Sequence, residues 1–89
     1  MMPTISVFLG IMIRMYTKDH PPPHFHAFHG EHEAQIAIET GEIIEGELPR
    51  MARRVVKEWT DANRERLAEN WRRREMGLPL ERIDGHISE

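Results

Sequence analysis

Residues 5–16, ISVFLGIMIRMY, hold the pattern that decides the fold class of this chain. Every odd-numbered position from Ile5 to Met15 is apolar, and this period of two indicates a half-buried strand. Gly10 interrupts the alternation, so the segment predicts either two short strands, over about 4–8 and 11–17, or one strand bent at the glycine. Three further strands are expected over residues 24–29, 33–39 and 43–45.

A helical segment follows the expected strands. Pro49 suits the first turn of a helix, because its missing N–H would have no partner there. Residues 60–63 are the weakest helical stretch, which leaves one kinked helix and two short helices as alternatives. Strands first and helix afterwards predict an α+β fold: a small antiparallel sheet of four to five strands with C-terminal helix packed on one face. Spacings of three and four form the stripe that would face this sheet: Ala52, Val55, Val56, Trp59, Asn63, Leu67 and Trp71.

The 89 residues are expected to form a single domain over 1–89. It divides into a sheet over 1–47 with a histidine-rich segment at 20–32, a helical segment over 48–76, and a tail over 77–89 that either adds a short strand at 81–83 or frays. The absence of cysteine excludes disulfides, thiolate metal sites and a cysteine nucleophile. No stretch of the sequence resembles a membrane span or a leader peptide, so a cytoplasmic protein is expected.

Five of the six histidines lie between His20 and His32. In a strand over 24–29 alternate side chains share a face, so packing Phe25 in the core places His24 and His26 together on the opposite face. The same alternation in the neighbouring strands turns a cation, a phenol, a carboxylate and an amide to this uncovered face. The expected set is Arg14, Tyr16, His24, His26, Glu33 and Gln35.

This set predicts an acid–base site for a phosphate-containing substrate. His24 and His26 would be the proton-transfer pair, because imidazoles titrate near neutrality. Arg14 would hold the phosphate, Tyr16 would orient it, and Glu33 would fix a histidine tautomer. The plainer alternative is the solvated polar side of an antiparallel sheet. The residues expected to bind substrate around the pair are Lys18, His20, Gln35, Arg50, Arg53 and Arg54.

Metal binding is an alternative for the same histidines. The spacing His20-x3-His24-x-His26 offers three imidazoles, with His29 or Glu33 as a fourth ligand. No established zinc signature is present, and the triproline run at 21–23 makes it hard for His20 to fold back. The expected site is therefore metal-independent and needs no cofactor.

Charge is divided unevenly along the chain. Residues 1–49 hold two basic against seven acidic residues, whereas residues 50–75 hold nine basic against five acidic. The second segment has an electrostatic case for nucleic acid, with a solvated helix face as the plainer explanation. Six of its arginines form the basic edge that would contact RNA phosphates or an acidic partner: Arg50, Arg53, Arg54, Arg72, Arg73 and Arg74.

The run from Asp19 to Ala27, DHPPPHFHA, resembles a bacterial domain-of-unknown-function family, numbered 4160. The resemblance extends over nearly the whole chain, from Pro3-Thr4-Ile5 through Glu33-Ala34 and Glu58-Trp59 to Asn70-Trp71. It implies a small cytoplasmic protein encoded beside a second small protein of unknown function (family 2442). The pair resembles a toxin–antitoxin module, with this chain similar to the growth-inhibiting toxin of the DhiT type. The motif positions it singles out are Arg14, Tyr16, His20, His24, His26 and Glu33.

The expected function is a type II toxin-like activity on RNA or the translation machinery. In RNA cleavage the substrate's own 2′-hydroxyl would attack, so no protein nucleophile is needed. The expected partners are a cognate small antitoxin encoded nearby and RNA, with no membrane, and exposed sheet edges favour a homodimer or a strand-sharing complex. The alternative is a non-enzymatic module that binds protein or nucleic acid.

Overall fold

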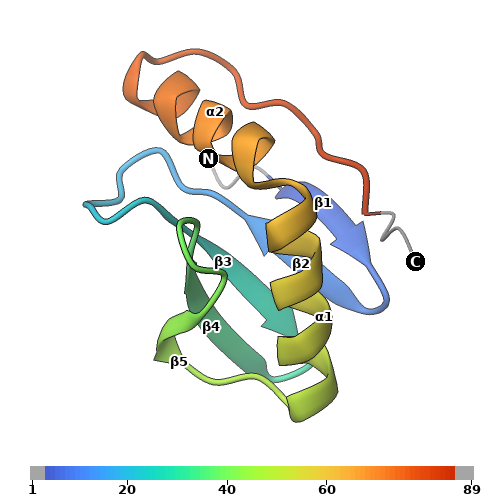
Figure 1. Ribbon diagram of the computed structural model, residues 1–89. Helices are drawn as coiled ribbons and strands as arrows, with labels where there is room; N and C mark the ends of the chain where they lie inside the picture. The colour runs from blue at the N-terminus through green and yellow to red at the C-terminus, as the bar shows by residue number, and fades with distance from the viewer. Residues whose placement is uncertain (1–3, 86–89) are drawn as a thin grey trace.

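The computed structural model describes residues 4–85 and has the expected α+β architecture. Five strands form one antiparallel sheet in the order β1-β2-β3-β4-β5, and two helices follow (Figure 1). Pro3 and residues 86–89 of the expected tail lie outside the described part. The elements are β1 (Thr4–Phe8), β2 (Ile11–Arg14), β3 (His24–His29), β4 (His32–Ala37), β5 (Ile43–Gly46), α1 (Arg50–Ala62) and α2 (Arg64–Glu75).

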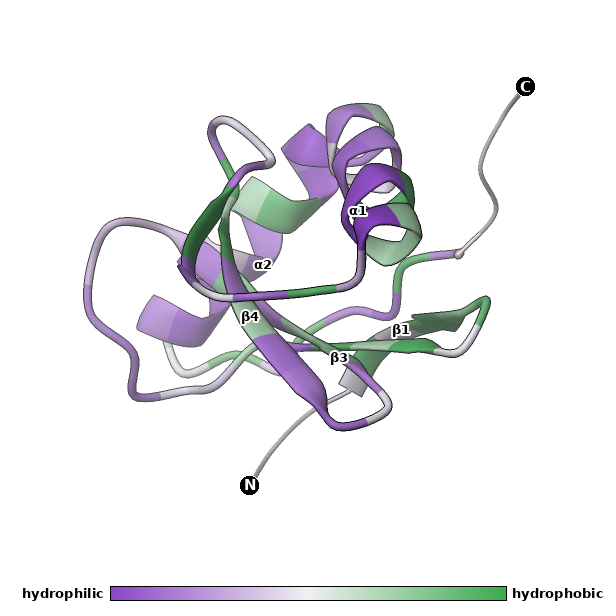
Figure 2. Cartoon of the chain, turned by 90° about the horizontal axis from the view of Figure 1, so that it is seen from below, coloured by the Kyte–Doolittle hydropathy of each residue, from purple (hydrophilic) through white to green (hydrophobic). Residues whose placement is uncertain are grey.

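One face of the sheet is apolar, and α1 lies across it (Figure 2). Alternation in β2, β3 and β4 turns Ile13, Phe25 and Ile36 to this face, where each is completely buried. Trp59 of α1 fills the centre, with its ring 5.8 Å from that of Phe25. Burying each of these large side chains contributes roughly 1.5–3 kcal/mol, so this contact fixes α1 on the sheet. Among residues 4–85 no helix combines the length and apolar character needed to cross a membrane.

Strand β1 departs from the simple alternation. Its pairing with β2 is irregular between Thr4 and Ser6, and beyond this bulge the even-numbered Ser6 and Phe8 face the core. Val7 is therefore 54% exposed and Leu9 73% exposed. The predicted alternation from Ile5 to Met15 therefore fails at Val7 and Leu9, because one extra residue at a bulge reverses the side chains that follow it in the same strand.

The helical segment is divided at Asn63, which resolves the alternative in favour of two short helices. The Asn63 N–H contacts the carbonyl oxygens of both Thr60 and Trp59, and its side-chain amide donates to Trp59 O at 2.9 Å. Asn63 thus closes α1 and precedes α2, although its side chain makes no N-terminal capping bond. The break lets α2 turn away from α1 toward the end of the sheet where β3 begins (Figure 1).

The tail after α2 contains no strand in its described part, so the predicted strand at 81–83 is wrong. It is nevertheless fastened to the domain rather than frayed. Asn70 holds both polar groups of the Glu81 main chain at 2.8 and 2.9 Å, and the Ile83 N–H donates to Ile5 O at 2.8 Å. These bonds place the tail beside β1.

Candidate functional site

The second face of the sheet carries the polar cluster. In the cross-strand register Arg14 of β2 lies opposite His26 of β3, and His26 lies opposite Gln35 of β4. Two pairs further along, and on the same face, Phe28 lies opposite Glu33. Directly opposed residues share a face of the sheet, so the register brings together side chains that period-two counting assigns to that face.

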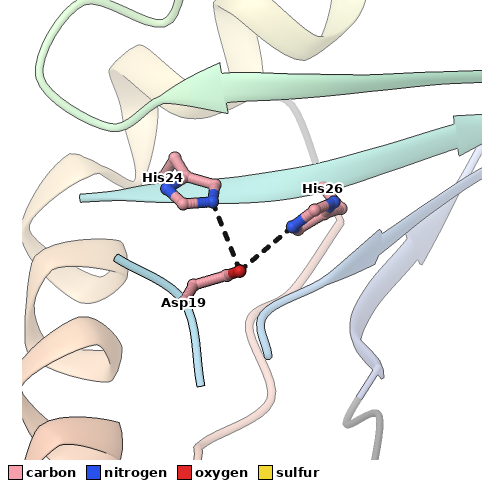
Figure 3. Close-up of side chains that lie close together, drawn as sticks. All are labelled: Asp19, His24 and His26. Carbon is pink, nitrogen blue, oxygen red and sulfur yellow. Dashed lines mark hydrogen bonds and ion pairs between the residues drawn. The ribbon is translucent and has the colours of Figure 1, made fainter. Parts of the chain in front are cut away.

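The segment between β2 and β3 adds a residue that the sequence did not single out. After Arg14 the chain leaves the sheet, two or three residues earlier than the expected strand end, and returns through the triproline run, and this path brings Asp19 to the histidines. Asp19 Oδ2 lies 3.2 Å from His24 Nε2 and 3.0 Å from His26 Nε2 (Figure 3). A single carboxylate oxygen therefore contacts the Nε2 atom of each imidazole.

The other nitrogen of each ring also has a partner. His24 Nδ1 donates to the carbonyl oxygen of Pro22 at 2.8 Å, and His26 Nδ1 lies 3.4 Å from Glu33 Oε2. A carbonyl oxygen only accepts, so His24 must carry its proton on Nδ1. In the neutral ring the Nε2 lone pair then points at the lone pairs of Asp19. The arrangement needs a cation on Nε2, which is either a second proton or a metal ion.

Helix α2 covers this cluster from the end of the sheet. Arg74 donates from Nη1 to Thr17 O and from Nη2 to Asp19 O, each at 3.0 Å. Its guanidinium carbon lies 3.5 Å from the centre of the Trp71 ring, and the Trp71 ring lies 5.4 Å from that of His24. Arg74 is only 8% exposed, so the prediction that it belongs to a basic surface edge is wrong. Its two forked donors instead hold the loop that carries Asp19.

The histidines are far less accessible than an uncovered sheet face implies. His24 is 1% exposed and His26 is 6% exposed. His24 lies beneath Asp19 and Trp71, while Tyr16 contacts the His26 ring edge-on with centroids 4.4 Å apart. The sequence pattern assigns a face to each side chain, but it does not say which loop or helix later covers that face.

Several predicted site residues lie away from this centre. His20 is exposed; its Nδ1 faces the oxygen of Pro21, and its ring centroid is 6.2 Å from that of His24. His29 borders a separate pocket with Leu9 and Met51. The three arginines expected to bind substrate are all exposed on α1, which covers the opposite face of the sheet: Arg50, Arg53 and Arg54.

Lys18 and Gln35 lie close to the centre in the chain or in the register. Lys18 is exposed and directly precedes Asp19 in the loop. Gln35 is partly buried and lies across from His26 on β4. Glu33 has its carboxylate beside His26 Nδ1, where it is placed to select the tautomer of that ring.

Asp19 and Arg74 are the residues that sequence reasoning missed. A signal for Asp19 was present, because this carboxylate is separated by one residue from the rigid proline run that leads into the histidine strand. No local signal marks Arg74, which lies 55 residues from its Asp19 partner and within a run of three arginines.

The comparison with known families places the chain in one of them. The family described as Domain of unknown function (DUF4160) matches residues 10–72, which is well over half of the sequence, so the chain belongs to this family. The matched region includes Asp19, His24 and His26 and ends two residues before Arg74. No curated protein and no solved structure matches the chain.

Proposed function

We propose that Asp19, His24 and His26 bind one divalent transition-metal ion and that this ion is the reactive centre of the protein. A single observation carries the proposal: both Nε2 atoms converge on the same oxygen of Asp19, while both Nδ1 atoms have an acceptor beside them. Histidines that bind metal through one nitrogen commonly donate the other N–H to a carbonyl or carboxylate, which fixes the ring and its tautomer. Pro22 O and Glu33 occupy these outer positions.

The distances fit metal ligation. Bonds of about 2.0–2.1 Å from zinc to nitrogen and oxygen separate the ligand atoms of a tetrahedron by about 3.3 Å. The two ring nitrogens lie 3.2 and 3.0 Å from Asp19 Oδ2, and the three candidate ligand atoms all lie within 4.8 Å of one another. A small shift outward from the common centre would admit an ion.

Ligation accounts for His24 better than proton transfer does. A general base must reach the proton that it removes, directly or through one water. His24 has both nitrogens engaged, by Pro22 and Asp19, and its ring is completely covered. A buried ligand needs no contact with substrate, whereas a buried proton shuttle does.

The ligand set indicates the kind of metal and chemistry. Two imidazoles and one carboxylate suit Zn²⁺ and other borderline ions such as Fe²⁺ and Co²⁺. Three protein ligands leave at least one coordination position for water or substrate, as in hydrolytic centres, whereas structural zinc sites are closed by four. When bound, such an ion polarises a substrate oxygen or lowers the pKa of a bound water.

The biological role that we propose is that of a toxin-like component of a bacterial type II toxin–antitoxin module, acting on RNA or the translation machinery. The resemblance of the DHPPPHFHA run to proteins of such modules supports this role. A neighbouring-gene antitoxin would then be the partner. Induced expression should arrest growth, co-expression of the neighbouring gene should relieve the arrest, and Asp19→Asn and His26→Gln should abolish it.

Metal binding itself is tested with protein carrying no histidine tag. Elemental analysis after loading with Zn²⁺ should give one ion per chain, and Co²⁺ should produce the visible absorption of a protein-bound ion. Asp19→Asn, His24→Gln and His26→Gln should each weaken Co²⁺ binding at least 10-fold. His32→Gln is the matched control, because His32 is an exposed strand histidine outside the centre.

Two results would contradict this assignment. Wild-type protein that binds no stoichiometric metal excludes the ion, and equal Co²⁺ affinity in Asp19→Asn and His32→Gln excludes these ligands. Growth arrest by metal-free protein that is lost in His26→Gln would instead support a proton-transfer centre, with Asp19 and Glu33 on either side of the ring.

A further inference from the structure

The two basic residues of the sheet half of the chain occupy positions adjacent to residues of the proposed metal centre. Residues 1–49 hold only two basic residues, Arg14 and Lys18, against seven acidic ones. Arg14 lies opposite His26 in the register, and Lys18 directly precedes Asp19. Two cations beside the centre of an otherwise acidic half indicate a site that receives an anion.

Neither cation is neutralised by the protein. Within residues 4–85 no ion pair involves Arg14 or Lys18. Arg14 is held by its Nε, which donates to Met12 Sδ at 3.1 Å, and by the face of its guanidinium, which lies 5.1 Å from the centre of the Phe28 ring. These contacts leave Nη1 and Nη2 with their hydrogen-bonding capacity, and paired guanidinium donors match the oxygens of a phosphate group.

Apart from Asp19 itself, the acidic side chains on this face lie on the β4 and β5 side of the centre. His26 separates Arg14 on β2 from Glu33 and Gln35 on β4, and Glu45 of β5 lies opposite Gln35. An anion is therefore favoured over β2 and repelled over β4 and β5. This polarity gives the site a direction, with the metal and Arg14 on the side that attracts negative charge.

We propose that Arg14 is the phosphate-binding residue of the site and that the substrate class is a phosphate ester. One phosphate oxygen would occupy the open position of the metal, other oxygens would accept from Arg14, and Lys18 would strengthen the attraction through solvent. The inference rests on the metal centre proposed above and deepens it. Tyr16 lies two residues after the end of β2, and its ring contacts the His26 ring beside Arg14's partner position in the register.

The test uses Co²⁺-loaded full-length protein and follows the visible absorption of the ion. The probes are inorganic phosphate, phenyl phosphate as a monoester, diphenyl phosphate as a diester, and acetate as an anion of another class. Phosphate should change the Co²⁺ absorption of the wild type at lower concentrations than acetate does. The affinities of the two esters then distinguish a monoester site from a diester site.

Arg14→Gln should bind Co²⁺ with wild-type affinity but bind phosphate about 10- to 100-fold more weakly, because charge-assisted hydrogen bonds are lost. Arg14→Lys keeps the positive charge but not the paired guanidinium donors, so its phosphate affinity should lie between those of the wild type and Arg14→Gln. Lys18→Gln should reduce the phosphate affinity only a few-fold, and this reduction should disappear at high salt. Arg66→Gln is the control, since Arg66 is an exposed arginine of α2 that donates to Arg82 O and belongs to none of the expected binding residues.

Equal phosphate affinity in Arg14→Gln and wild type, with Co²⁺ bound to both, would overturn the assignment of Arg14. Acetate binding as tight as phosphate would overturn the substrate class. Failure of wild-type protein to bind Co²⁺ would refute the metal centre instead. Arg14 is then judged by amide NMR shifts of Tyr16 and His26 on addition of phosphate: shifts that vanish in Arg14→Gln retain the phosphate site, and no shifts refute it.

Discussion

Arg74 in α2 donates a hydrogen bond of 3.0 Å to the main-chain oxygen of Asp19, 55 residues earlier in the chain. The second arm of the same guanidinium donates to Thr17 O at 3.0 Å. The helix thereby fixes the backbone on both sides of Lys18 and with it the position of the Asp19 carboxylate. The candidate centre thus has three structural sources: strand β3, the loop before it, and a helix from the far end of the chain.

Arg74→Met should weaken metal binding without unfolding the protein. The methionine retains an unbranched stem beside Trp71, but the carbonyl oxygens of Thr17 and Asp19 lose their donors. We expect Co²⁺ affinity to fall about 10-fold or more, the usual effect of removing an outer-shell partner. The free energy of unfolding, measured in urea, should fall by about 1–3 kcal/mol.

Arg73→Met is the control for this change. Arg73 donates to Pro79 O in the tail and, within residues 4–85, makes no hydrogen bond or ion pair with the Asp19 loop, so its loss should leave Co²⁺ affinity unchanged. If Arg74→Met and Arg73→Met bind Co²⁺ equally well, Arg74 does not position Asp19.

Metal should stabilise the folded protein by mass action. An ion that binds only the folded state at a free concentration of 100 times its Kd adds about 2.7 kcal/mol to the free energy of unfolding. For a domain of this size that corresponds to a rise in Tm of roughly 10 °C or more. Differential scanning calorimetry with Zn²⁺, then with EDTA, should show the rise and its reversal.

Asp19→Asn provides the comparison, because it removes the carboxylate that contacts both histidines while keeping the shape of the side chain. Its Tm should respond little to Zn²⁺. A Tm that rises equally in the variant and the wild type would place the bound metal elsewhere in the protein.

Leu9→Asn should stabilise the protein. Leu9 and Gly10 form the two-residue turn between β1 and β2, and both have positive φ, +50° and +77°. This conformation costs an ordinary L-residue about 1–2 kcal/mol, whereas asparagine tolerates it well. Since the Leu9 side chain is largely exposed, little packing is lost. We expect the urea midpoint to rise by the equivalent of about 1 kcal/mol.

Leu9→Ala separates the backbone effect from the side chain. It removes the exposed side chain but keeps a residue that dislikes positive φ, so its stability should stay near that of the wild type. Equal stability of the Asn and Ala variants would mean that strain at Leu9 does not limit the fold.

The junction of the two helices should lose stabilisation in acid. Hydrogen bonds from Lys57 and then from Arg64 hold the pKa of Asp61 below its usual value of 3.8. A pKa that is lower in the folded state stabilises the protein above the unfolded-state pKa, and this contribution disappears as the pH falls through the folded-state pKa. Asp61 is exposed, so we expect a small effect.

This dependence is measured by urea unfolding of the wild type and Asp61→Asn at about pH 7 and about pH 3. The wild type should be the more stable of the two at the higher pH, and the difference should shrink at the lower. A difference that does not change with pH would contradict the role of the ionised carboxylate.

Local pattern was sufficient for much of this protein. The alternation of side chains along a strand has a fixed period of two, so neighbours in sequence decide which residues share a face. For that reason the residue order predicted the strand over 24–29 and the common face of Arg14 and His26. It also predicted the burial of Phe25, Ile13 and Ile36. The α+β class followed equally, because strands preceded a helical stripe.

The long-range contacts depended on the folded chain. A bulge in β1 reversed the faces of Val7 and Phe8, and no neighbouring residue in the sequence predicted this bulge. Asp19 reached the histidines through a loop, and Arg74 reached Asp19 from α2, so neither contact has a period or spacing that could be counted. Residue order establishes which side chains point the same way, whereas the donor set of the centre depends on how loops and helices return through space.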